Sequence, residues 1–268
     1  MEEKHVSRYS FPLRYFQIKK NTAEQSRYVL FVQNIVQDAL LMIFLLLVLS
    51  VFRAGFLFLF RDTLTAATSW QDIALTLWYG SRISLKTAGA CVLPTFVLGT
   101  LIQAACPKWN ATLWRFCWAF FVLLVLSLLF QARIPYYQEF HSAFSPFMFN
   151  TFHDDVGAII STSIEQYHAV WRVLAGGICG VILCGLCYQW LTRLTPKFVR
   201  KFEAVALRGW VVLMICLLLI PFAVFVRKGG SFTFNGSIYW KNAARMDQHI
   251  LNEAILDDVQ AIYRASRI

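Results

Sequence analysis

The sequence predicts an all-α integral membrane protein built on a bundle of five transmembrane helices. Hydrophobic residues make up 58% of the 268 residues and charged residues only 15%, against roughly 25% charged in a typical soluble domain. The apolar residues gather in runs of about 20, the length that a helix needs to cross the hydrocarbon core of a bilayer. This combination excludes a water-soluble globule, a coiled coil, a disordered chain and a disulfide scaffold.

Five apolar runs are long enough to span, and Trp and Tyr residues gather near their ends, as they do at membrane interfaces. The second run contains Pro94 and two glycines, so a re-entrant second segment with four full spans is the alternative. The expected spans are 29–52, 83–105, 109–130, 168–191 and 207–226. They divide the chain into a basic leader (1–28), a transmembrane domain (29–226) and an extracytoplasmic linker (227–268).

The positive charges predict on which side each connection lies. Cytoplasmic connections of membrane proteins are rich in Lys and Arg. With the N-terminus inside, 13 of the 25 Lys and Arg residues fall on the cytoplasmic side against four acids. We therefore expect the N-terminus inside and the C-terminus outside. No small-residue cleavage site follows the first apolar run, so the first helix is expected to be a retained anchor rather than a signal peptide.

Short amphipathic helices are expected in two outer segments. Ser69-Trp-Gln-Asp72 has the spacing of a capping box, which predicts a short helix that ends near Leu77. Near the C-terminus, apolar residues recur at helical spacing and predict one more helix. They are Leu251, Ile255, Val259 and Ile262.

Short stretches of the outer segments resemble a known family. They are Tyr79-Gly-Ser-Arg-Ile-Ser84, Tyr137-x-x-Phe140 with the stretch 154–167, Arg227-Lys-Gly-Gly230, and 251–264. Together they resemble the membrane region of lipoteichoic acid synthase-like proteins, with a G-x-R-x-D motif at the second helix and an R-G-G … N-E-x-x-x-N-P pattern after the last. The chain departs from this pattern twice, because Ser84 stands where the family has Asp and Asp257-Asp258 replaces Asn-Pro.

The resemblance implies a parent enzyme of the alkaline phosphatase/sulfatase superfamily in a bacterial cytoplasmic membrane. Such an enzyme transfers phosphoglycerol or phosphoethanolamine from a phospholipid, outside that membrane. Its Thr nucleophile and its divalent metal, such as Mn, belong to a catalytic domain that would begin after Ile268. We therefore expect no catalytic residue, metal ligand or cofactor within this chain.

Asp38 is the one carboxylate well inside an expected span, where ionisable groups are costly and often functional. It shares one helix face with Gln33, Asn34 and Gln37. Because Asp38 lies near the basic inner side, a polar stripe that packs toward the bundle is the preferred interpretation. Arg53 on the same helix cannot be its partner, since 15 residues at about 1.5 Å each place the two more than about 20 Å apart.

Residues that could bind a lipid headgroup are expected at the outer face, because the planar guanidinium of Arg donates two hydrogen bonds to a phosphate. The candidates are Arg53, Arg82, Tyr136, Tyr137 and Arg227. The alternative is ordinary snorkelling of the charge to the interface. Snorkelling is preferred for Arg53, whereas Arg82 lies in the family-like motif and both interpretations stay open for it.

Other patterns are interpreted as packing or solvation. His141, His153 and the neighbouring acids match no zinc-binding spacing. Cys184-Gly-Leu-Cys187 falls inside an expected span, where the two cysteines act as small packing residues. Gly176 and Gly180 allow close approach of another helix, either within the bundle or between two copies in a homodimer.

The basic stretch 193–208 is expected to face anionic lipids of the bilayer rather than nucleic acid. Two functions remain. The first is the membrane anchor and lipid-presenting domain of a headgroup transferase. The alternative is a non-enzymatic transporter, channel subunit or scaffold, in which Asp38 would line a path. The fourth and fifth expected spans carry no central charge and no inverted repeat is present, so the first function is preferred.

Overall fold

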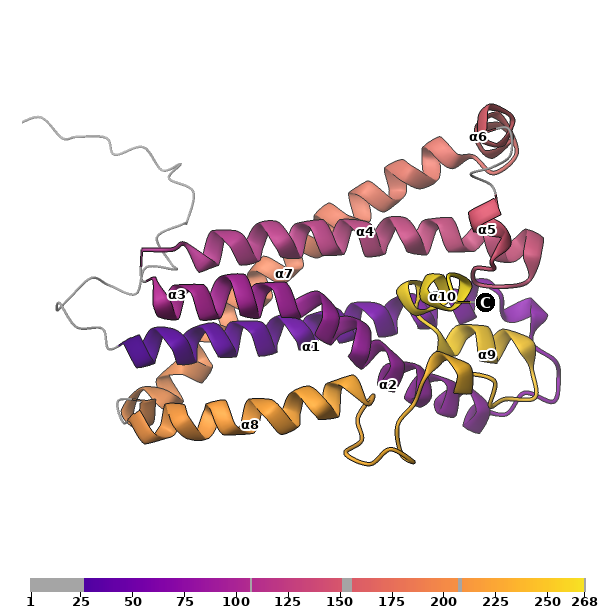
Figure 1. Ribbon diagram of the computed structural model, residues 1–268. Coiled ribbons are helices and arrows are strands. Elements are labelled where there is room, and N and C mark those ends of the chain that lie inside the picture. Colours follow the sequence, from indigo (N-terminus) through magenta and orange to yellow (C-terminus); the bar gives the residue numbers. More distant parts are fainter. Residues whose placement is uncertain (1–26, 107, 151–155, 207–208, 268) are drawn as a thin grey trace, which may run out of the picture.

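The computed structural model describes residues 27–106, 108–150, 156–206 and 209–267. Within these ranges every regular element is a helix, and four helical stretches are long and apolar enough to cross a membrane (Figure 1). They are Val29–Leu59, Trp70–Ala105, Ala111–Phe140 and Ala169–Arg200. The predicted all-α membrane class is therefore confirmed. The fifth expected span corresponds to α8 (Gly209–Arg227), whose apolar part Leu213–Arg227 is shorter than the other four.

The first helix, α1 (Arg27–Leu59), supplies the centre of the main core. Its 33 residues extend over about 50 Å, which exceeds the roughly 30 Å of a hydrocarbon core. Leu41, Leu45 and Leu49 lie one helical turn apart and are almost fully buried, because α2, α4 and α7 all pack against this face. Burial of large apolar side chains on one stripe fixes the rotation of α1 within the bundle.

The second helix is longer than expected. α2 (Trp70–Pro94) begins at the predicted capping box, in which Ser69 and Asp72 exchange side-chain and backbone hydrogen bonds. The prediction that this helix ends near Leu77 is wrong, since no helix breaker follows and Thr76 and Ile83 are buried in one continuous helix. After Pro94 the helix continues as the π-helical segment η3 (Thr95–Leu101) and α3 (Ile102–Ala105). A proline that lacks its N–H is a usual cause of such a change of register.

The third long helix, α4 (Ala111–Phe140), is capped by Asn110, whose side chain accepts from the backbone N–H of Leu113. It continues ten residues beyond the expected end at 130 and stops where His141 adopts a left-handed conformation, with φ of 49°. Two short helices follow, α5 (Phe147–Asn150) and α6 (Val156–Glu165). This extension carries Arg133, Tyr136 and Tyr137 on a rigid helix rather than in a loop.

The fourth long helix, α7 (Ala169–Ala206), crosses α4 diagonally in Figure 1. A Cβ atom on Gly176 would lie 2.9 Å from Leu128, and one on Gly180 would lie 3.0 Å from the backbone of Leu124. The two glycines therefore provide a close approach to α4 within the bundle. The basic stretch after residue 192, which lies beyond the expected span, is helical as far as Ala206.

The chain then passes through α8 and turns sharply into its C-terminal segment. Gly229 and Gly230 both have positive φ, and their N–H groups donate to Val226 and Phe225, which is the Schellman arrangement at a helix C-terminus. Beyond the turn lie η5 (Trp240–Asn242), α9 (His249–Ile255) and α10 (Asp258–Ala265). The single helix expected here is two helices, because the side chain of Asp257 caps α10 through the N–H of Gln260.

Candidate functional site: the docked C-terminal segment

Residues 228–267, called the docked segment below, pack onto one end of the bundle. Figure 1 shows α9 and α10 beside the beginning of α2 and the ends of α1 and α4. Ile238, Ile255, Leu256 and Ala261 are fully buried in a cluster that includes Ile83 of α2. A second cluster joins α9 to the end of α1 and to Tyr137. The docked segment therefore has its own apolar contact with the bundle.

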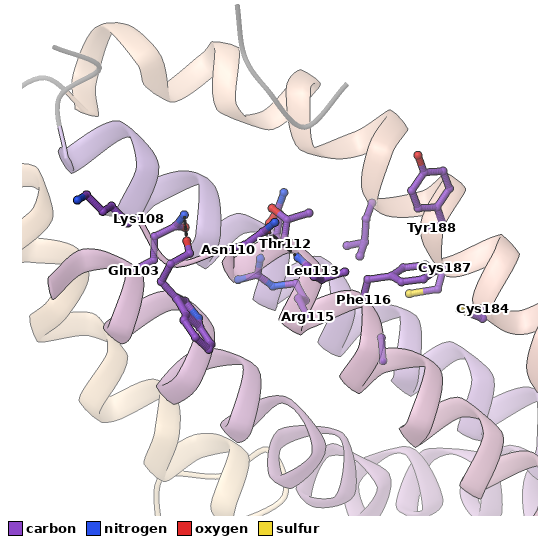
Figure 2. Close-up of a pocket in the computed structure, with 14 residues that line it drawn as sticks. Gln103, Lys108, Asn110, Thr112, Leu113, Arg115, Phe116, Cys184, Cys187 and Tyr188 are labelled. Atoms are coloured by element: carbon purple, nitrogen blue, oxygen red, sulfur yellow. Dashed lines mark hydrogen bonds between the residues drawn. The ribbon is translucent and has the colours of Figure 1, made fainter. Parts of the chain in front are cut away.

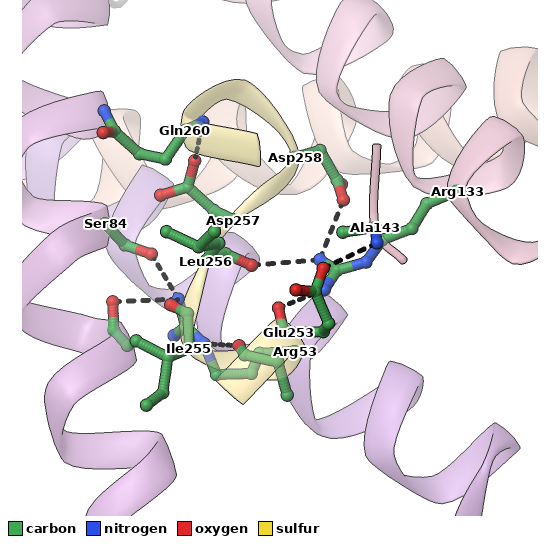
Figure 3. Close-up of polar contacts among 12 residues, drawn as sticks. Arg53, Ser84, Arg133, Ala143, Glu253, Ile255, Leu256, Asp257, Asp258 and Gln260 are labelled. Carbon is green, nitrogen blue, oxygen red and sulfur yellow. Dashed lines mark hydrogen bonds and ion pairs between the residues drawn. The ribbon is translucent and has the colours of Figure 1, made fainter. Parts of the chain in front are cut away.

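Arg53 of α1 binds the backbone of the docked segment. Its Nε donates to the carbonyl of Ala254 at 2.9 Å, and its Nη2 donates to Gly80 and to Ser84 of α2 and also reaches the carbonyl of Ile255 (Figure 3). The residue is only 3% exposed. Snorkelling was therefore the wrong interpretation of Arg53, because its guanidinium is used inside the protein to join α1, α2 and α9.

Arg133 of α4 makes a parallel set of contacts from the other side. Its Nη2 donates to the carbonyl of Glu253 at 2.7 Å, and its Nη1 donates to the carbonyl of Leu256 and to Oδ1 of Asp258 at 3.0 Å (Figure 3). Arg133 and Asp258 form an ion pair of which both side chains are 3% exposed. Burial raises the pKa of the Asp258 carboxyl, and the charge of Arg133 opposes that rise.

Glu253 ties the docked segment to itself and to the loop after α4. Both of its carboxylate oxygens accept from Arg264 at 2.8 Å, and Oε2 also accepts from the N–H of Ala143 at 2.7 Å. Burial alone would raise the pKa of Glu253, but the hydrogen bonds and charge of Arg264 outweigh burial and hold that pKa below its ordinary value. The carboxylate is thus an ionised junction between three segments.

The two departures from the family pattern both lie in this contact region. Ser84 accepts a hydrogen bond from Arg53 at 2.7 Å. Asp258 pairs with Arg133, and Asp257 caps α10 while it accepts from the hydroxyl of Thr87 at 3.0 Å. Both carboxylates that replace Asn-Pro are therefore buried and hydrogen-bonded.

Arg82 and Lys86 of α2 hold the loop that connects α8 to η5. Arg82 donates from Nε to the carbonyl of Gly229 at 2.8 Å and from Nη2 to that of Gly236. Lys86 donates to the carbonyl of Ile238, and its ammonium lies 3.8 Å from the centre of the Tyr239 ring. These side chains of α2 therefore hold the backbone of the loop against the helix.

Three positive groups gather here, and they are called the cation cluster below: Arg82, Lys86 and Arg227. Arg227 and Arg82 lie close enough to Lys86 for their positive charges to repel its ammonium group. Arg227 is exposed and forms no hydrogen bond or ion pair with any residue that the structure describes. No carboxylate of the described residues pairs with any member of the cluster. A group of cations without a carboxylate partner, of which Arg227 is exposed, is suited to a phosphate.

The candidate headgroup residues therefore separate into two groups. Arg82 and Arg227 lie together in the cation cluster. Tyr137 is 3% exposed and packs edge-on against Phe56, with ring centres 4.9 Å apart. The hydroxyl of Tyr136 forms a hydrogen bond with the hydroxyl of Ser145 and accepts another from the backbone N–H of Ser145. The two tyrosines and Arg53 support the docked segment and its surroundings.

Asp38 lies in the main bundle, toward the end opposite the docked segment. Its carboxylate accepts from Nε of Arg115 at 2.8 Å and from the hydroxyl of Thr100, and Gln37 and Asn34 accept from the same guanidinium. Arg115 and Asp38 are almost fully buried. The interpretation of a polar stripe packed into the bundle is confirmed for Asn34, Gln37 and Asp38.

Sequence reasoning missed the roles of Arg115 and Arg133. Neither was singled out, because each lies near the end of an expected span. One signal was present for Arg115, since a basic residue five positions inside a helix and a lone carboxylate in another span are natural partners. For Arg133 no such signal exists, because its partners are three backbone and side-chain groups more than 100 residues away.

No group of three or more His, Cys, Asp or Glu residues that could hold a metal occurs in the part of the chain that the structure describes. His153, Asp154 and Asp155 lie outside that part. The fold defines a helical membrane protein with a C-terminal segment docked on one end of its bundle. Comparisons with protein-family models, with curated proteins and with solved structures found no match to this chain.

Proposed function

We propose that this chain is the membrane anchor and lipid-presenting part of a lipoteichoic acid synthase-like enzyme that transfers a phospholipid headgroup outside the bacterial cytoplasmic membrane. One observation carries the proposal. Residues of the stretches that resemble this family lie far apart in the sequence but come together at one end of the bundle. Arg82 reaches Gly229, Arg53 joins Ser84 to α9, and Tyr137 packs against the same helix.

The docked segment would give such an enzyme a fixed connection between membrane and catalytic domain. The buried residues Arg53 and Arg133 donate hydrogen bonds to four consecutive carbonyl groups, those of residues 253–256. Hydrogen bonds to charged donors are worth roughly 1.5–3 kcal/mol each. A domain that follows would therefore be held at one height and orientation above the bilayer rather than on a flexible tether.

The cation cluster is the proposed headgroup site. A phosphate of an anionic phospholipid between Arg227 and Lys86 would supply the negative charge that the cluster lacks. Because Arg82 is occupied by Gly229 and Gly236, its role in this proposal is to position the loop beside the site. The phospholipid would be presented at the docked end, next to the point where the chain leaves the membrane.

The proposed topology has five spans, with the N-terminus inside and the docked segment outside. α8 supports the fifth span, because in Figure 1 it runs alongside the bundle toward the docked end, where Arg227 terminates it. The transporter alternative is not favoured, since Asp38 is neutralised by Arg115 and is not available to line a path for ions.

The gene beyond codon 268 tests the proposal. It should continue into a metal-dependent phosphotransferase domain, and an immediate stop codon would contradict the assignment. Sidedness tests the topology in a variant without the seven native cysteines. A membrane-impermeant maleimide should label Asn235→Cys in intact cells, whereas Lys197→Cys should react only after permeabilisation. The reverse pattern would overturn the orientation.

A further inference from the structure

A cavity of about 550 Å³ lies between α4 and α7, at the end of the bundle opposite the docked segment (Figure 2). This volume falls within the range of small-molecule sites in proteins. Most of its lining is apolar and comes from both helices. The apolar lining residues are Trp109, Leu113, Phe116, Ala119, Cys184, Cys187 and Leu191. The cavity is called the α4–α7 cavity below.

The charged part of the lining is positive. Arg115 lines the α4–α7 cavity, but its charge is balanced by Asp38. Lys108 also lines it, is exposed, and makes no hydrogen bond or ion pair with any described residue. Among the residues that the structure describes, no Asp or Glu lines the cavity. The beginning of α4 lies here too, and the dipole of a helix places partial positive charge at its N-terminus.

A second, independent observation is an unsatisfied donor. Gln37 lines the α4–α7 cavity and is 1% exposed. Its Oε1 accepts from Nη1 of Arg115, which fixes the amide so that Nε2 is the remaining group. Nε2 is buried and has no hydrogen-bond partner. A buried amide donor without an acceptor is unusual in proteins and indicates that an acceptor atom belongs there.

We propose that the α4–α7 cavity binds an anionic membrane lipid. One acyl chain lies against the apolar walls, the anionic headgroup lies at Lys108, and an oxygen of the headgroup or ester region accepts from Nε2 of Gln37. An amphiphile is required because a small free anion would leave the apolar walls in contact with nothing. Leu113 and Phe116 are exposed beside the cavity, so a chain can enter from the bilayer. This site is separate from the cation cluster, because none of Arg82, Lys86 and Arg227 lines the cavity.

The probe is phosphatidylglycerol with a photoreactive diazirine in one acyl chain, added to the protein in nanodiscs of phosphatidylcholine. After irradiation, mass spectrometry of peptides locates the labelled residues. Label should concentrate on residues 112–119 and 184–191, compared with the lipid-facing residues Leu217 and Leu218 of α8. Unlabelled phosphatidylglycerol should compete, whereas phosphatidylcholine with the same chains and glycerol phosphate without chains should not.

Two pairs of variants separate this site from general lipid contact. Lys108→Ala should weaken competition by phosphatidylglycerol about fivefold, whereas Lys197→Ala, an exposed lysine outside the cavity, should not. Cys187→Phe should fill the cavity and abolish the local label. Ile178→Phe, at an exposed position of the same helix, should leave it intact.

Label spread evenly over all lipid-facing helices would overturn the proposal, as would local label that Lys108→Ala leaves unchanged. Competition by glycerol phosphate alone would also overturn it, because the ligand would then be a soluble anion. Loss of the cation cluster, as in Arg227→Ala, should not alter the label at the α4–α7 cavity. The outcome therefore does not depend on the proposed headgroup transfer.

Discussion

Replacing Arg133 by Ala should release the docked segment from the bundle. The change removes three hydrogen bonds to residues 253–258 and leaves the carboxylate of Asp258 buried without a counter-charge. Loss of one partner of a buried ion pair costs about 3–5 kcal/mol. If the docked segment opens as a unit, this loss lowers the protection of its amides by roughly 10² to 10³·⁵, at about 1.4 kcal/mol for each factor of ten.

The assay is hydrogen exchange followed by mass spectrometry on the protein in nanodiscs. The loss of protection should be confined to the docked segment, while peptides of α1 and α7 keep theirs. Arg61→Ala is the matched control, because Arg61 and its partner Asp62 are 64% and 92% exposed and such pairs contribute about 0–1 kcal/mol. Unchanged exchange in residues 249–265 would refute the reasoning.

A second variant separates the ion pair from the carbonyl contacts. Asp258→Leu combined with Arg133→Met removes both charges and keeps the apolar volume, so the protection lost to the unpaired carboxylate should return. The part that depends on the hydrogen bonds of Arg133 to the carbonyls of residues 253 and 256 should stay lost. The pH dependence has a definite sign. Since burial raises the pKa of Asp258, the cost of Arg133→Ala should shrink as the pH falls through that raised pKa and the carboxyl takes up a proton. A cost that grows on acidification would contradict this explanation.

Three further predictions concern the bundle, the turn and the docked segment. Arg115→Ala should lower the free energy of unfolding in detergent by about 3–5 kcal/mol, because it leaves Asp38 buried and unpaired. Unfolding is measured by titration with SDS, and a loss under about 1 kcal/mol would show that the ion pair does not stabilise the bundle. In the same titration, Gly229→Ala should lower the free energy of unfolding by about 1–2 kcal/mol because of its positive φ alone, and the new methyl group would also clash with Ile238. Gly177→Ala is the control and should not lower it, because a methyl group there meets open space. Because the pKa of Glu253 is lowered below its ordinary 4.5, its contribution should be complete above about that pH and vanish as the pH falls through the lowered pKa. Proteolysis of the docked segment should therefore accelerate in acid, and Glu253→Gln should remove that acid-dependent change.

The apolar runs predicted where the chain could cross a membrane, because a bilayer requires about 20 apolar residues whatever the neighbours are. The helix ends were missed where polar sequence simply continues a helix. Residues 70–82 contain no proline, and the helices continue through Pro135 and Pro196 in 131–140 and 193–206, so tertiary packing decides where these helices end.

The candidate site was predicted in part. The family-like stretches selected Arg82, Tyr137 and Arg227, and the structure brings the first and last together. The role of Arg53 could not be predicted, since its acceptors are carbonyl groups of residues 254 and 255, which carry no sequence signature. The break of the C-terminal helix had a local signal in Asp257, because Asp is a favoured N-cap residue, but the apolar spacing concealed it.

Headgroup transfer by the protein expressed from its whole gene tests the central proposal most directly. Vesicles that contain phosphatidylglycerol with a fluorescent acyl chain should yield fluorescent diacylglycerol when Mn²⁺ is present. Arg82→Ala and Arg227→Ala should each lower this turnover while membrane insertion stays intact. Absence of diacylglycerol release from the wild-type protein, or turnover that neither variant changes, would contradict the proposal.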